Sequence, residues 1–98
     1  MTNSSAINKM TEDILNDRVS ESVARKMSGE IATLTMKEGD YSYIMSLLVH
    51  NGRSARVGLS ALDLCNEIPY EFNVILSSLA NSADEDIAKS AQKLWTEL

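Results

Sequence analysis

Two arginines flank a turn that could bind an anion. The stretch NGRSAR (Asn51–Arg56) places Arg53 and Arg56 on either side of Ser54, directly after an Asn-Gly turn. A helix that begins here would present free backbone N–H groups beside two guanidinium groups, and such a set can hold a phosphate or a carboxylate. The stretch lacks the GxxxxGK[ST] spacing of a P-loop, so it does not indicate nucleotide hydrolysis. We expect an exposed turn whose arginines contact a protein partner.

An acidic turn and a tyrosine pair complete the predicted partner surface. The turn DED (Asp84, Glu85 and Asp86) lacks the spacing of a calcium loop, and carboxylates in a first helical turn are stabilised by the helix dipole. In YSY, Tyr41 and Tyr43 offer rigid contact area with a polar tip, and residues two apart on a helix face different sides. The predicted partner-binding residues are therefore Arg53, Arg56, Tyr41, Tyr43, Asp84, Glu85 and Asp86.

One histidine and one cysteine limit the chemistry that the chain can perform. Catalysis by His50 and Cys65 would need both side chains in one cleft with a third group that orients them. One Cys and one His cannot supply the four ligands of a structural zinc site. We therefore predict no enzyme activity, no cofactor and no metal site, with Cys65 as a buried apolar residue. A single cysteine also excludes an intramolecular disulfide and fits a reducing cytoplasm.

The charge distribution predicts which partners the chain avoids. The net charge is −5, and residues 61–98 contain two basic and seven acidic residues. Such a surface repels phosphate backbones and anionic lipids, so we expect neither nucleic-acid nor membrane binding, and a basic partner would suit it. No apolar run approaches the roughly 20 residues that span a bilayer, and the first residues lack the apolar core of a secretory signal. We expect a cytoplasmic protein, and a chain of this size could gain stability as a homodimer.

Apolar residues recur at three- and four-residue spacing almost throughout, which predicts helices and no sheet. We expect residues 1–5 to be frayed and residues 6–37 to form one helix or a helix pair, since the stripe breaks between Ile14 and Val19. Gly39 then ends this segment. We predict that residues 41–68 and 70–98 form two hairpin-like units. The predicted fold is a single all-α domain of four to six helices, packed as antiparallel hairpins in an array or a small bundle.

The two hairpin-like units match each other when the chain is shifted by 30 residues without a gap. Segment Ile44–Ile68 then aligns with Val74–Leu98. The shared features are the turn Asn, a small residue where helices would cross, and the apolar stripe of the second helix. The pairs are Asn51 with Asn81, Gly58 with Ala88, Leu64 with Leu94, and Cys65 with Trp95. This register predicts that Leu64 and Leu94 are both buried.

This pattern resembles HEAT-like helical repeats over residues 41–98. The period is shorter than is typical, and the usual Arg of the second helix is absent, because Gly58 and Ala88 follow Val57 and Ile87. The resemblance implies a solenoid in which the N-terminal segment is a cap or a third layer. Members of such families mostly scaffold or dock proteins. The leading hypothesis is therefore a non-enzymatic interaction module: a small adaptor, inhibitor or regulatory subunit.

Two other functions remain open from the sequence. The stretch Gly58–Asn81 also resembles the helix-turn-helix part of transcription regulators. Its second helix, Tyr70–Ala80, contains Glu71 and no Lys or Arg, which argues against phosphate contacts. The third hypothesis is a binder of a small anionic ligand at the Arg53 and Arg56 turn.

Overall fold

The chain folds into six α-helices and one short 3-10 helix in a computed structural model, which describes residues 3–97. The elements are α1 (Asn3–Leu15), α2 (Glu21–Glu38), α3 (Ser42–His50), α4 (Gly52–Asp63), η1 (Tyr70–Phe72), α5 (Asn73–Leu79) and α6 (Glu85–Thr96). Within residues 3–97 there is no strand. The predicted all-α fold of four to six helices is confirmed.

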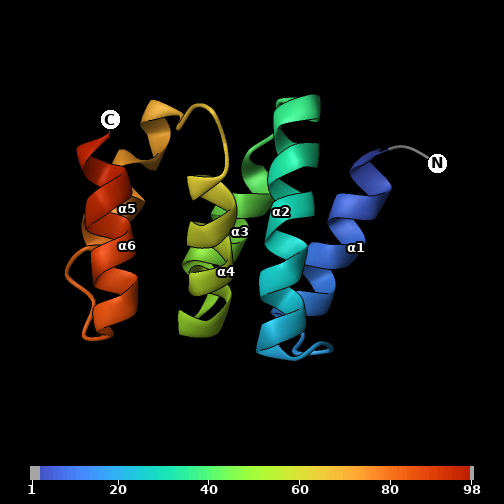
Figure 1. The fold of residues 1–98 in the computed structure, drawn as a ribbon, viewed down its shortest axis with the longest axis horizontal. Helices are drawn as coiled ribbons and strands as arrows, with labels where there is room; N and C mark the ends of the chain where they lie inside the picture. Colours follow the sequence, from blue (N-terminus) through green and yellow to red (C-terminus); the bar gives the residue numbers. More distant parts are fainter. Residues whose placement is uncertain (1–2, 98) are drawn as a thin grey trace.

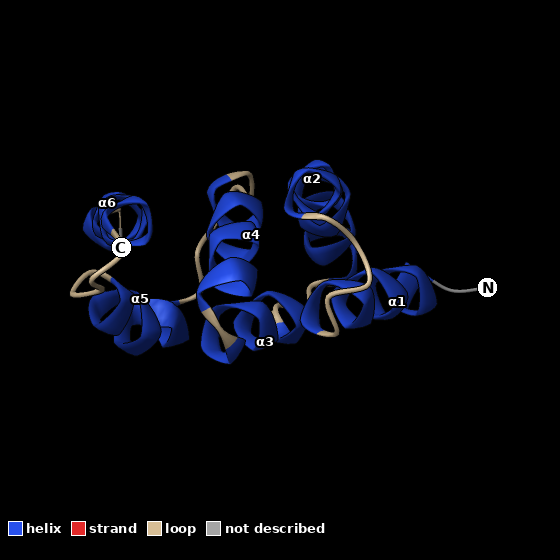
Figure 2. Ribbon diagram, turned by 90° about the horizontal axis from the view of Figure 1, so that it is seen from below, coloured by secondary structure: helices blue, strands red, loops and turns tan. Residues whose placement is uncertain are grey.

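The helices pair into three antiparallel hairpins, α1–α2, α3–α4 and α5–α6, which lie side by side (Figure 1). The first helices, α1, α3 and α5, form one layer, and the second helices, α2, α4 and α6, form the other (Figure 2). The segment 6–37 thus contributes to two helices. Their connection includes Asp17, whose φ of 55° reverses the chain, and Ser20, whose side chain caps α2 by accepting from Val23 N.

Side chains at the helix starts explain most element boundaries. Asn51 caps α4: its Oδ1 accepts from Ser54 N at 2.8 Å, while its own N–H donates to Ser54 Oγ at 3.1 Å. Gly39 ends α2 in the left-handed conformation, with φ 72°, as its sequence position indicates. One boundary differs from the expectation. Residues 3–5 belong to α1 although residues 1–5 were expected to fray, and residues 1–2 lie outside the described part.

The second helices share one buried stripe that faces the first-helix layer. Three sets of positions are buried in all three hairpins: Ala24, Ser54 and Ile87; Ser28, Gly58 and Ala91; Ile31, Ala61 and Leu94. The middle set consists of small residues, which allow helices to approach closely. We call this alignment, in which the helix caps Asn51 and Asp84 also match, the cap-aligned register.

The gapless 30-residue register is wrong for the second helices. Leu94 is 1% exposed as expected, but Leu64 is 53% exposed, because α4 ends at Asp63 and Leu64 lies at its C-cap. A single residue, Asn51, joins α3 to α4, whereas residues 80–84 join α5 to α6. The longer turn shifts α6 by three residues, which is close to one turn of 3.6 residues. Apolar positions therefore still aligned with apolar positions in the wrong register, and the true counterpart of Leu94 is Ala61.

Gly58 lies where α4 crosses α3 most closely. A Cβ at Gly58 would lie 3.0 Å from Leu48 Cδ2 and 3.1 Å from Leu47 Cβ, and the Leu47 atom is fixed by its backbone. Gly58→Ala should therefore lower the free energy of unfolding by about 1 kcal/mol, since overpacking outweighs the gain in helix propensity. Gly29→Ala is the matched control: nothing lies within 4 Å of its Cβ position, so unfolding free energy should rise by about 1 kcal/mol. Denaturant melts in which both variants are more stable than wild type would contradict this crossing.

Candidate functional site

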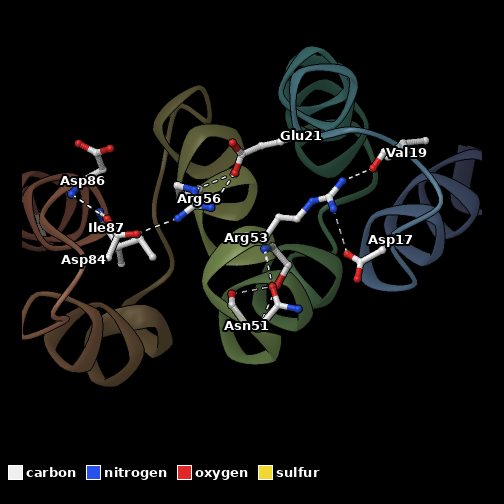
Figure 3. Close-up of polar contacts among 10 residues, drawn as sticks. Asp17, Val19, Glu21, Asn51, Arg53, Arg56, Asp84, Asp86 and Ile87 are labelled. Carbon is white, nitrogen blue, oxygen red and sulfur yellow. Dashed lines mark hydrogen bonds and ion pairs between the residues drawn. The ribbon is translucent and has the colours of Figure 1, made fainter.

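The turns of the three hairpins lie side by side at one edge of the molecule, the lower edge in Figure 1. These turns are residues 16–20, Asn51 and residues 80–84. The predicted partner surface already combined residues of the last two turns. The first turn joins them because α1 and α2 form a hairpin of their own. The edge therefore brings together the charged side chains of three helix starts (Figure 3).

Arg56 connects the starts of α2 and α6 through α4. Its Nε donates to Glu21 Oε1 at 2.9 Å and its Nη2 lies 2.7 Å from the same oxygen. Its Nη1 donates to Asp84 Oδ2 at 2.8 Å. The Arg56 side chain is only 26% exposed. We call these three residues the Arg56 bridge, in which each nitrogen of the guanidinium contacts a carboxylate of the chain itself.

Arg53 is likewise used within the chain. Its Nη2 donates to the backbone oxygen of Val19, and its Nη1 lies 3.4 Å from Asp17 Oδ1. Arg53 Nε is buried without a hydrogen-bond partner. The expectation that Arg53 and Arg56 are solvated side chains of an exposed turn is therefore wrong. Their contacts with Asp17, Val19 and Glu21 span more than 30 residues of sequence, and no local pattern indicates them.

The acidic turn stabilises α6, as its position in the sequence indicates. Asp84 Oδ1 accepts from Asp86 N at 3.0 Å and from Ile87 N at 3.3 Å. Asp84 is thus the N-cap of α6. Glu85 and Asp86 are exposed in the first turn of the helix.

The two tyrosines do not join this edge. Tyr41 and Tyr43 lie at the start of α3, whereas the turn follows its last residue; α3 has nine residues, so roughly 13 Å separate its ends. Both side chains are half-buried against the core. Tyr41 packs edge-on against Phe72, with ring centroids 6.1 Å apart, and its burial raises the pKa of the phenol. The predicted surface of two turns and a tyrosine is therefore not assembled by the fold.

His50 and Cys65 lie at opposite ends of α4. His50 precedes the Asn51 turn, and Cys65 follows the last residue of the helix, whose 12 residues span roughly 18 Å. Cys65 Sγ donates to Ala61 O at 3.4 Å, and burial raises the pKa of this half-buried thiol. A raised pKa keeps the thiol protonated and lowers its nucleophilicity. The two side chains cannot act as a nucleophile and its base.

The Arg56 bridge predicts an acid-dependent part of stability. The hydrogen bond from Arg56 holds the pKa of the Glu21 carboxyl below its ordinary value of 4.5. Because the folded pKa is depressed, the contribution of Glu21 is fully present above that ordinary value and is lost as pH falls through the lowered pKa. Glu21→Gln should be less stable than wild type at neutral pH, and the difference should vanish in acid. Urea melts of Glu21→Gln and wild type, from neutral pH to below the lowered pKa of Glu21, test this prediction. A stability difference that does not change with pH would contradict it. Glu30→Gln is the exposed control.

A polar cleft of about 470 Å³ lies over α4, between α2 and α6. Its cations include Arg25, Lys89 and Lys93, and its carboxylates are Asp63 and Asp86. Lys93 and Asp63 form an ion pair across it at 3.3 Å. Mixed and partly paired charges do not favour one anionic ligand here. Within residues 3–97, no group of three or more His, Cys, Asp or Glu side chains is placed to bind a metal ion.

The last hairpin exposes apolar side chains that sequence reasoning did not single out. Tyr70 is 80% exposed, Val74 is 78% exposed and Trp95 is 41% exposed. Trp95 Nε1 donates to Asn73 Oδ1 at 2.6 Å, which places the indole over the start of α5. We call Tyr70, Val74 and Trp95 the end face. The cap-aligned register would have indicated it, because that register places Trp95 at the position of the core residue Leu62.

Comparison with models of known protein families, with curated protein sequences and with solved structures found no match to this chain. The HEAT-like resemblance therefore has only the internal repeat as support. Among the described residues, no helix combines the length and the apolarity that crossing a bilayer requires.

Proposed function

We propose that this chain is a non-enzymatic protein-interaction module, a short HEAT-like array whose last hairpin docks a larger protein. The observation that carries this proposal is the difference between α4 and α6. In α4, a second stripe consisting of Ala55, Leu59 and Leu62 is buried, and α4 contacts α6 of the next hairpin. The cap-aligned positions of α6 are Ala88, Gln92 and Trp95, and the last two are exposed.

A monomer seldom displays large apolar side chains together without a use for them. Aromatic residues are also the side chains that most often anchor protein interfaces. The Arg56 bridge also supports the proposal, because it connects the starts of α2, α4 and α6 through contacts within the chain. The array can therefore present its end as a preformed surface, which reduces the entropy cost of binding.

The proposal is tested by tagging the chain in its native host, recovering bound proteins and identifying them by mass spectrometry. We expect a protein that binds the purified chain directly and saturably. Retention on duplex DNA that falls steeply with salt would instead favour the helix-turn-helix alternative. The segment Tyr70–Ala80, the second helix of that alternative, contains no Lys or Arg, so we expect no such retention.

A further inference from the structure

The Asn51-Gly52 pair is the only Asn-Gly dipeptide of the chain, and the fold does not require its glycine. Among residues 3–97, Gly39 is the only glycine with a positive φ, so Gly52 has an ordinary backbone conformation. A Cβ at position 52 would meet Ile87 Cδ1 at 3.6 Å, which is a normal van der Waals contact. Alanine would therefore fit at this first position of α4, and it has the higher helix propensity.

A glycine that follows asparagine has a chemical consequence. The backbone nitrogen of Gly52 has no Cβ beside it to hinder its attack on the side-chain carbonyl carbon of Asn51. The new C–N bond closes a five-membered succinimide, the C–N bond of the side-chain amide breaks, and the amide nitrogen leaves as ammonia with the proton of Gly52. Water then opens the ring at either carbonyl carbon. One opening gives aspartate, and the other gives isoaspartate, whose backbone runs through the side-chain methylene.

The fold prevents this attack by conformation and not by exclusion of water. Asn51 is exposed, so solvent reaches its side chain. Ring closure requires Asn51 Cβ and Gly52 N to eclipse each other about the Cα–C bond, whereas a ψ of 177° holds them staggered. The capping box fixes this conformation, because Asn51 Oδ1 accepts from Ser54 N while Asn51 N donates to Ser54 Oγ. Ser54 Oγ also donates to Leu47 O at 2.7 Å, which connects the box to the end of α3.

We propose that Asn51-Gly52 is a latent deamidation site, which the capping box of α4 keeps closed and which local opening of the α3–α4 hairpin activates. Asn51 is the only residue between α3 and α4, so isoaspartate there adds a backbone atom to the shortest connection of the array. Arg53 and Arg56 lie in the first turns of α4, so their contacts with the other hairpins depend on this connection. The isoaspartyl product therefore loosens the array, whereas the aspartyl product retains an N-cap of similar strength.

Peptide mapping by mass spectrometry measures isoaspartate at position 51 after incubation of the full chain at mildly alkaline pH. We expect isoaspartate to form at least about tenfold faster in guanidinium chloride than in native buffer, because only open molecules react. Asn81, which precedes Ser82, is the internal control and should form much less isoaspartate than position 51 in guanidinium chloride. Equal rates at position 51 in the two solutions would overturn the inference.

Two buried serines distinguish opening of the capping box from a general loss of stability. Ser54→Ala removes one bond of the box and its contact with Leu47, and should speed isoaspartate formation in native buffer roughly fivefold. Ser28→Ala removes a buried hydroxyl that contacts Ser60 Oγ, and should change the rate less than about twofold. Equal rates in the two variants would contradict control by the box. If Ser54→Ala does not fold, the comparison of wild type in the two solutions decides.

Two further variants test the chemistry and its consequence. Gly52→Ala places a Cβ beside the attacking nitrogen and should slow isoaspartate formation in guanidinium chloride roughly tenfold. Asn51→Asp, the other product of ring opening, should unfold at nearly the denaturant concentration that unfolds wild type, whereas the purified isoaspartyl form should unfold at a lower one. Isoaspartate that forms as fast in Gly52→Ala as in wild type, or an isoaspartyl form as stable as Asn51→Asp, would also overturn the inference.

Discussion

Replacing Leu94 with Ala should lower the free energy of unfolding by about 2–5 kcal/mol, the range for a large buried side chain. Leu94 is 1% exposed and belongs to the stripe of α6 that faces the first-helix layer. The surrounding helices cannot fully close the cavity, so lost transfer energy and lost packing add together. Leu64→Ala is the matched control. Leu64 is 53% exposed, and its truncation should change stability by about 0.5 kcal/mol or less.

Denaturant melts of the two variants distinguish the two registers. The cap-aligned register predicts a large loss for Leu94→Ala alone. The gapless 30-residue register predicts equal, large losses for both. A cost above about 2 kcal/mol for Leu64→Ala would therefore contradict the placement of Leu64 at the C-cap of α4.

Arg56→Glu should lower the free energy of unfolding by about 1–2 kcal/mol, because two partly screened ion pairs are lost and like charges are brought together. The change removes hydrogen bonds to Glu21 and Asp84 and places a third carboxylate between them. Isolated exposed ion pairs contribute little, but a partly buried arginine that binds two carboxylates in a network contributes more. The side chains of Glu21 and Asp84 are 39% and 37% exposed, so solvent screens part of the new repulsion.

Lys26→Glu provides the control for net charge. Lys26 is exposed on α2 and forms no ion pair with any residue of the described range 3–97. Its reversal should change stability by about 0.5 kcal/mol or less. Thermal and denaturant melts at low salt provide the comparison. Equal stabilities for Arg56→Glu and wild type would show that Arg56 is the solvated side chain that the sequence suggested.

Local signals in the sequence were sufficient for the helices. The three- and four-residue periodicity predicted an all-α chain, Gly39 predicted the end of α2, and the DED turn predicted the start of α6. Each signal acts within a few residues, since capping, dipole and periodicity are properties of one helix. The small residue at position 58 also indicated a helix crossing, because a residue without a Cβ lets two helices approach closely.

Long-range contacts account for the failures. Whether Arg56 is solvated depends on Glu21 and Asp84, which reach it only after three hairpins have packed. The burial of Leu64 was mispredicted because turn length, which a gapless comparison ignores, sets the register of the second helix. The tyrosines were expected at the turns, but the length of α3 places them at the opposite edge. The exposed end face is likewise a property of the array and not of any one helix.

Hydrogen–deuterium exchange of the full chain, with and without the protein recovered from its host, tests the proposed function most directly. Binding at the end face predicts slower exchange in η1 and α5, over residues 70–79, and in the C-terminal half of α6, with little change in α3. Slower exchange at Asn51–Arg56 and Asn81–Asp86, with none in residues 70–79, would contradict it. That result would instead identify the turns as the binding surface.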